Sequence, residues 1–189
     1  AYGACLLGSI NLAKLIDKPF EKGASMDLTA LRELTGTAVR MLDNVIDISR
    51  YPIDQQREEA VSKRRIGLGI TGLADALIMC GVRYGSEEAV NLTKNWSRVL
   101  RDSAYRCSID LAKEKGSFPL FVKEKFIENH NVKKLPKDLR AGINSYGIRN
   151  ALLTSIAPTG TISLLANNVS SGLEPVFAFK YNRKVLQSD

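Results

Sequence analysis

The chain has 189 residues, of which 44% are hydrophobic and 25% charged, a composition typical of a soluble globular protein and a length that fits one domain or a piece of a larger one. Its net charge of +7 favours anionic partners such as nucleotides, but the basic residues form only short, scattered clusters, so we expect no nucleic-acid partner. No apolar run is long enough to cross a membrane, and the three cysteines are not spaced as in a disulfide framework or a zinc site. We therefore expect a cytoplasmic protein with no membrane partner.

The first fifty residues predict one long helix. Residues 4–7 are a short apolar run, and residues 9–16 continue with helical spacing. Residues 18–25 contain a proline and a glycine and are expected to form a loop. Asp27 is a suitable N-cap for a helix over residues 28–49. The apolar positions of this helix recur every three or four residues and predict one buried face: Leu28, Leu31, Leu34, Ala38, Met41, Leu42, Val45 and Ile46.

The middle of the chain predicts a strand between helices. Residues 54–64 are polar and favour a surface helix, residues 65–70 favour a short strand, and residues 73–79 favour another helix. A second long helix is expected over residues 86–115, because Ser86 can cap its start and a glycine follows its end.

The last third predicts a strand that leads into a turn and a short helix. Residues 118–134 are irregular or briefly helical, and residues 136–146 favour a helix. Residues 151–163 (ALLTSIAPTGTIS) combine an apolar strand, a Pro-Thr-Gly turn and the start of a helix, and residues 176–186 favour an extended run. Because strands alternate with helices, we predict an undivided α/β fold with largely parallel strands.

The turn at residues 158–163 is the strongest candidate site. A helix start leaves backbone N–H groups unpaired at the positive end of the helix dipole, and this one carries three hydroxyl side chains and a glycine. These groups favour a bound anion, above all a phosphate, although serine and threonine also cap helices that bind nothing. The residues concerned are Pro158, Thr159, Gly160, Thr161, Ile162 and Ser163. The polar loop 167–175 that follows is expected to contact the substrate.

Other motifs carry weaker signals. Residues 67–72 match G-x-G-x-x-G, but no acid follows a second strand at the required distance, so a tight strand-to-helix turn is favoured over dinucleotide binding. Cys80 and Cys107 lie in helical patterns and are expected to be buried structural thiols, and His130 a surface residue. Cys5 lies near a strand end beside an expected helix start, where a functional thiol and a core residue are both open alternatives.

Three segments resemble, in the same order, the large catalytic chain of ribonucleotide reductases, and most closely the adenosylcobalamin-dependent class. They are GACLLGSINL, RRIGLGITGLADAL and SIAPTGTISLLANNVSSGLEPVFAFKYNRKVL. The resemblance implies that residues 1–189 are part of a ten-stranded α/β barrel, a partial catalytic domain truncated at both ends. It also implies that the turn 158–163 holds the phosphates of a ribonucleoside di- or triphosphate. Cys5 would be one of two thiols that reduce the ribose, although Leu6 stands where asparagine is common.

The resemblance further implies radical chemistry. A thiyl radical, generated with adenosylcobalamin, would abstract the 3′-hydrogen of the ribose; the 2′-hydroxyl would leave as water while the thiol pair becomes a disulfide. A thioredoxin-type reductant and a homodimer of the full-length chain are expected. The thiyl cysteine and the partner of Cys5 would lie outside this sequence, so we expect the fragment alone to be inactive. Two alternatives remain: the metal-radical reductase that needs a second subunit, and a non-catalytic nucleotide-binding module.

Overall fold

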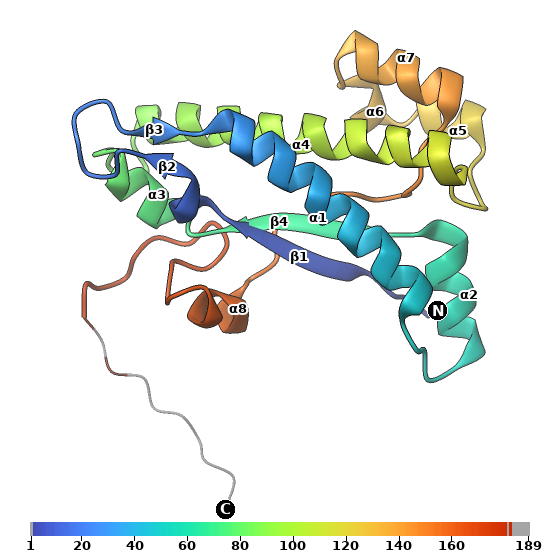
Figure 1. The fold of residues 1–189 in the computed structure, drawn as a ribbon, viewed down its shortest axis with the longest axis horizontal. Coiled ribbons are helices and arrows are strands. Elements are labelled where there is room, and N and C mark those ends of the chain that lie inside the picture. The colour runs from blue at the N-terminus through green and yellow to red at the C-terminus, as the bar shows by residue number, and fades with distance from the viewer. Residues whose placement is uncertain (1, 181, 183–189) are drawn as a thin grey trace, which may run out of the picture.

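The computed structural model describes residues 2–180 and 182, and its centre is a short parallel sheet (Figure 1). Strand β1 (Leu6–Asn11) pairs in parallel with strand β4 (Ile66–Thr71). The register places Leu6 opposite Ile66 and Asn11 opposite Thr71, so the two strands begin and end together. The predicted α/β arrangement with parallel strands is therefore confirmed.

A third segment, residues 152–155, extends the sheet on the other side of β4. The N–H of Leu68 donates to the carbonyl of Leu153 at 2.8 Å, and the N–H of Ser155 donates to the carbonyl of Leu68 at 3.2 Å. Thr154 forms a parallel bridge with Leu68, which confirms the predicted extended course of this segment. Within the described residues the sheet stays open and does not close into a barrel.

Two long helices cover one face of this sheet (Figure 1). Helix α1 (Leu28–Ile48) packs against both β1 and β4, and helix α4 (Glu87–Lys115) lies alongside α1. Both start where expected: Asp27 accepts hydrogen bonds from the first turn of α1, and Ser86 accepts one from the first turn of α4. The core between helices and sheet is formed by branched aliphatic side chains, among them Leu31, Val39, Leu42, Ile46, Ile66, Leu68 and Ile70.

The buried face of α1 is only partly the predicted one. Leu34 and Met41, both expected inside, are 42% and 59% exposed. Thr35 and Asp43 are fully buried instead. The Thr35 hydroxyl donates a hydrogen bond to the carbonyl of Leu31 in the same helix, so this buried hydroxyl has a partner. Hydrophobic periodicity does not predict these positions, because it treats every polar residue as exposed. A polar side chain can be buried when it has hydrogen-bond partners.

The remaining elements connect the strands and the long helices, and some of them lie beside α4, away from the sheet (Figure 1). The surface helix α2, the helix α3 after β4 and helix α7 form where the sequence predicts them. Within the described residues these elements are η1 (Leu12–Leu15), β2 (Ile16–Asp17), β3 (Ser25–Met26), α2 (Asp54–Lys63), α3 (Leu73–Met79), α5 (Lys123–Ile127), α6 (His130–Lys133), α7 (Lys137–Tyr146) and α8 (Gly160–Leu165).

Two expectations need correction. Residues 9–16 do not form a helix: the first three belong to β1, and only Leu12–Leu15 form a single 3₁₀ turn. Pairing with β4 explains this, because it satisfies the backbone of β1 and buries Ile10, whose position also fits a helical pattern. Residues 176–180 contain no strand, and the rest of the expected extended run lies outside the described residues except for Asn182.

A buried polar cluster fixes the beginnings of two strands against α1. Asp43 accepts hydrogen bonds at 2.9 Å from Arg64, which precedes β4, and at 2.9 Å from Asn150, which precedes residues 152–155. Arg64 also binds Asp47 at 2.7 Å, and its guanidinium holds the pKa of Asp47 below the usual value. Because Asp43 and Asn150 are fully buried, these bonds fix where both strands start.

Candidate functional site

The face of the sheet opposite α1 carries the candidate site, and we call it the open face. A Cβ on Gly8 would meet Leu42 of α1 at 3.3 Å, so Gly8 points towards the helix layer. Side chains alternate along a strand, and Leu7 therefore points to the open face, where it is 57% exposed. Helix α8 also lies on this side of the sheet (Figure 1).

The glycines of β4 allow another segment to cross the open face. A Cβ on Gly69 would overlap the carbonyl oxygen of Ser155, and one on Gly67 would lie 2.8 Å from the Ser155 hydroxyl. Gly69 is therefore required by the close approach of the backbone at residues 155–157, whereas a Cβ on Gly67 would meet the side chains of Leu7, at 2.6 Å, and Ser155. This packing accounts for the first two glycines of the G-x-G-x-x-G motif and agrees with the favoured tight-turn interpretation.

The turn 158–163 combines exposed backbone donors with a left-handed residue. Thr159 has φ 55° and ψ 16° and immediately precedes α8. The first hydrogen bond of the helix runs from the N–H of Ser163 to the carbonyl of Thr159 at 2.8 Å. Helix geometry leaves the N–H groups of the three residues before Ser163 without an intrahelical acceptor. Gly160 and Thr161 are exposed, so these donors can reach an anion from solvent.

Hydrogen bonds from neighbouring segments hold the side chain of Thr159 inside the protein. The N–H of Gly172 donates to the Thr159 hydroxyl oxygen at 2.7 Å, and the Thr71 hydroxyl donates to the carbonyl of Ser170 at 2.9 Å. The two threonine oxygens lie 3.1 Å apart. Because Thr71 has already given its one proton to a carbonyl, Thr159 must donate to Thr71. The proton of the Thr159 hydroxyl is thus used inside the protein.

Of the three hydroxyls predicted to surround an anion, one faces solvent. Thr159 and Ser163 are 7% and 3% exposed. The Ser163 hydroxyl donates to the carbonyl of Gly160 at 3.1 Å and lies 3.1 Å from the hydroxyl of Ser171. Thr161 is exposed. The turn therefore presents backbone N–H groups and the Thr161 hydroxyl outward, while its other two hydroxyls maintain its shape.

Cys5 and the turn lie at opposite ends of the open face. Cys5 directly precedes β1, whereas Thr71, which contacts the turn, ends β4 opposite Asn11. Asn11 lies six positions beyond Cys5 along the strand, about 20 Å at the usual rise per residue. The structure therefore places the two predicted features on one strand pair without bringing them into contact.

The environment of Cys5 keeps its side chain protonated. The thiol is exposed and free, yet desolvation by its neighbours raises its pKa above the ordinary value. The positive charge of Arg65, which directly precedes β4, opposes this shift only in part. These surroundings therefore favour the protonated form of the Cys5 thiol. Cys80 and Cys107, expected to be buried, are only partly buried, and both pack against the core.

Sequence reasoning missed the residues that hold α8 in place. Thr71 and Gly172 fix its first turn, and the side-chain amide of Asn11 donates to the carbonyl of Ala166 at its last turn, at 3.4 Å. Asn11 and Thr71 are register partners at the carboxyl ends of β1 and β4. The polar loop 167–175 was a visible signal, but its contact with β4 depends on the fold and not on local sequence.

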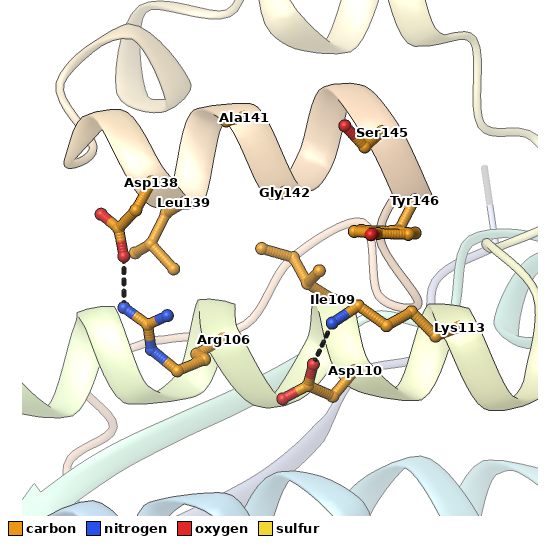
Figure 2. A pocket seen from close by; sticks show the side chains of 10 residues that line it. All are labelled: Arg106, Ile109, Asp110, Lys113, Asp138, Leu139, Ala141, Gly142, Ser145 and Tyr146. Carbon is orange, nitrogen blue, oxygen red and sulfur yellow. Dashed lines mark hydrogen bonds and ion pairs between the residues drawn. The ribbon is translucent and has the colours of Figure 1, made fainter.

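A separate cavity of about 300 Å³ lies between α4 and α7 (Figure 2). Arg106 binds Asp138 at 2.5 Å at one end, and at the other Lys113 binds Asp110 at 2.7 Å. The Lys113 amine also lies 4.7 Å from the ring centroid of Tyr146. Each cation of this cavity already has a carboxylate, so the cavity is a poor anion site and is best described as a gap between two neighbouring helices.

The comparisons with known proteins agree on one family. A family model described as the barrel domain of ribonucleotide reductase matches residues 1–189. A protein from Mycobacterium tuberculosis (strain H37Rv), named vitamin B12-dependent ribonucleoside-diphosphate reductase, is 42% identical over 98% of this chain and 23% of its own length. A protein of that name from Thermoplasma acidophilum is 37% identical over 98% of this chain and 22% of its own.

A more distant relative carries a different name. A protein from Chlamydia pneumoniae, named ribonucleoside-diphosphate reductase subunit alpha, is 32% identical over 98% of this chain and 19% of its own length. The chain thus spans less than a quarter of the length of these three relatives. Among the described residues, no helix is long and apolar enough to span a membrane.

Proposed function

The chain belongs to the barrel-domain family of the ribonucleotide reductases, and we propose that it forms part of a larger catalytic chain that reduces ribonucleotides to deoxyribonucleotides. The match of the family model to all 189 residues carries this proposal. The parallel strand pair with helices on one face and an open second face is consistent with a portion of such a barrel. We propose an oxidoreductase of the cytoplasm that acts as a homodimer in its full-length form.

The substrate proposed for the full-length chain is a ribonucleoside diphosphate, the substrate class in the names of the relatives. Its phosphates would bind at the turn 158–163, where the backbone donors of Gly160 and Thr161 and the Thr161 hydroxyl face solvent. Pro158 and Ile162 flank these donors, whereas Thr159 and Ser163 act by holding the turn in shape. A nucleotide anchored there would lie on the open face, the face whose other end carries Cys5.

Cys5 is proposed as one of two thiols that reduce the ribose by way of a thiyl-radical reaction. The C2′–O bond breaks and the 2′-hydroxyl leaves as water, while two thiols supply two electrons and form a disulfide. The second thiol and the thiyl cysteine would belong to the rest of the full-length chain. An exposed thiol with a raised pKa suits this role, because it keeps the hydrogen that the reaction consumes. A thioredoxin-type dithiol would then reduce the disulfide.

Adenosylcobalamin is the proposed cofactor of the full-length enzyme. The relatives named for vitamin B12 are 42% and 37% identical to this chain, compared with 32% for the relative named subunit alpha. The described residues contain no group of three or more His, Cys, Asp or Glu side chains that could hold a metal ion, and no residue of this chain is proposed to bind the cofactor. The cofactor, when bound elsewhere in the chain, would supply the radical.

The test is product formation by the full-length protein that contains this chain. It is incubated with a ribonucleoside diphosphate, adenosylcobalamin and a dithiol, and the deoxyribonucleotide is quantified by chromatography. We expect product that depends on both adenosylcobalamin and the dithiol. Product formed only when a second, metal-containing subunit is added would support the alternative reductase class. Nucleotide binding without any product under either condition would support the non-catalytic module.

A further inference from the structure

Helix α3, which follows β4, is capped by a residue from a distant segment. Its own N-cap residue is Gly72, which has no side chain to accept a hydrogen bond. The hydroxyl of Ser170 accepts one from the N–H of Ala74 at 3.1 Å, and the carboxylate of Asp75 accepts one from the N–H of Ser170 at 2.6 Å. These two reciprocal bonds have the pattern of a capping box whose two halves come from segments 95 residues apart.

The same serine also binds the corner between β4 and α3 through its carbonyl. The carbonyl oxygen of Ser170 accepts the N–H of Gly72 at 2.7 Å and the Thr71 hydroxyl at 2.9 Å. The N–H, the hydroxyl oxygen and the carbonyl oxygen of Ser170 are thus all engaged at this one corner. Ser170 is therefore fixed relative to β4, and so is the loop that contains it.

The turn 158–163 is attached to this corner at two points. Thr159 donates to Thr71, and it accepts from Gly172, two residues beyond Ser170. Thr159 occupies the left-handed region, which is unfavourable for a β-branched residue and persists only where neighbouring groups enforce it. Thr71 is 2% exposed and Thr159 7% exposed, so the hydrogen bond between them is shielded from solvent.

We propose that Thr71, Asp75 and Ser170 are positioning residues that hold the turn 158–163 in the geometry that binds the substrate phosphates. The proposal rests on the proposed function of that turn. None of the three side chains faces the anion; they act through Thr159, whose left-handed conformation sets the direction of the free N–H groups of Gly160 and Thr161. Without the Thr71 hydroxyl the Thr159 proton loses this acceptor, and the turn can relax.

The decisive variant is Thr71→Val in the full-length reductase, since valine has the shape of threonine but cannot hydrogen-bond. We expect the KM for the ribonucleoside diphosphate to rise about tenfold, the effect of losing one to two hydrogen bonds, while kcat stays within about twofold. The inhibition constant of pyrophosphate should rise by a similar factor. Thr71→Ser keeps the hydroxyl and should restore both values.

A matched control and a second pair of variants make the test decisive. Thr37→Val makes the same chemical change on the exposed side of α1 and should alter neither constant. Ser170→Ala and Asp75→Ala each remove one of the two bonds of the capping box that Ser170 and Asp75 form. Each variant should raise the KM as Thr71→Val does. These two variants test the proposal even if Thr71→Val does not fold. An unchanged KM and an unchanged pyrophosphate constant in these variants would overturn the proposal.

The failure of this inference can be distinguished from a failure of the proposed phosphate site. If pyrophosphate does not compete with the substrate in the unaltered enzyme, the turn does not bind phosphates. The proposed phosphate site and the proposed positioning role are then both wrong. If pyrophosphate competes in the unaltered enzyme and competes equally well in the Thr71, Ser170 and Asp75 variants, the phosphate site stands and the positioning role is wrong. A fall in kcat at constant KM would also overturn it.

Discussion

The hydroxyl of Thr159 donates to the hydroxyl of Thr71 across 3.1 Å, although 88 residues separate them. This bond joins the turn 158–163 to the last residue of β4. The other end of α8 is held by Asn11, the register partner of Thr71 on β1. The candidate phosphate turn is therefore seated at the carboxyl edge of two parallel strands, the edge where α/β proteins bind their ligands.

Thr161→Val tests the outward side of the turn. Thr161 is exposed and carries the one hydroxyl of the turn that faces solvent. Because hydrogen bonds to charged groups contribute about 1.5–3 kcal/mol, we expect the KM for the ribonucleoside diphosphate to rise by about tenfold or more. Steady-state kinetics of the full-length enzyme measure this, with Thr93→Val on α4 as the control. An unaltered KM would show that the turn caps the helix and does not bind the substrate phosphates.

Gly69→Ala should destabilise the protein because its methyl group would overlap the carbonyl oxygen of Ser155. Overpacking of this kind costs about 1–3 kcal/mol, which should lower the thermal unfolding midpoint of the full-length chain. Gly36→Ala is a sharp control: Gly36 lies within α1, nothing lies within 4 Å of an added methyl group, and alanine favours a helix by up to about 1 kcal/mol. Equal midpoints for the two variants would contradict the close packing of residues 155–157.

Arg65→Leu should move the reactivity of Cys5 to higher pH. Desolvation already raises the pKa of the Cys5 thiol, and Arg65 lowers it in part. Removing that positive charge therefore raises the pKa further, so less thiolate is present at any pH near neutrality. Alkylation of Cys5, followed by mass spectrometry over a range of pH, measures the midpoint. Arg98→Leu, on α4, is the control, and identical profiles for all three proteins would show that Arg65 does not act on the thiol.

Asp47→Asn tests the buried polar cluster by its dependence on pH. Arg64 holds the pKa of Asp47 below its usual value of 3.8, so the carboxylate stabilises the folded state above that value. This stability is lost as the pH falls through the lowered pKa. We expect the variant to be less stable by about 1 kcal/mol at neutral pH, a small figure because Asp47 is half exposed, and the difference to vanish in strong acid. Chemical unfolding of the full-length chain at both pH values measures this.

A matched substitution decides whether the effect in Asp47→Asn is specific. Asp110→Asn removes one partner of an exposed pair with Lys113 and should change stability little at any pH. If Asp47→Asn behaved like Asp110→Asn, the ion pair with Arg64 would contribute nothing to the fold.

Local signals in the sequence predicted much of the fold. Asp27 and Ser86 could be identified as caps because a cap depends on the few residues that follow it. Residues 9–16 were assigned wrongly because their structure depends on pairing with a strand about 60 residues away. The burial of Asp43 was hidden for the same reason, since its partners Arg64 and Asn150 come from other parts of the chain.

The candidate site, like the fold, could be predicted from the sequence only where it depends on local residues. The exposed backbone of the turn 158–163 follows from its own sequence, because any helix start leaves donors free. The inward direction of the Thr159 hydroxyl does not follow, because it is set by Thr71 and Gly172. The cap that Ser170 provides for α3 was equally invisible, since Gly72 offers no side chain that would hint at a missing partner.

The proposed role of Cys5 is tested most directly by a single turnover of the full-length chain carrying Cys5→Ser. The protein is reduced beforehand, freed of dithiol, and mixed with ribonucleoside diphosphate and adenosylcobalamin. We expect the unaltered chain and the control Cys107→Ser to form deoxyribonucleotide, and Cys5→Ser to form none, because the reducing thiol is gone. Deoxyribonucleotide formed by Cys5→Ser in the same amount as by the unaltered chain would contradict the central claim that Cys5 reduces the substrate.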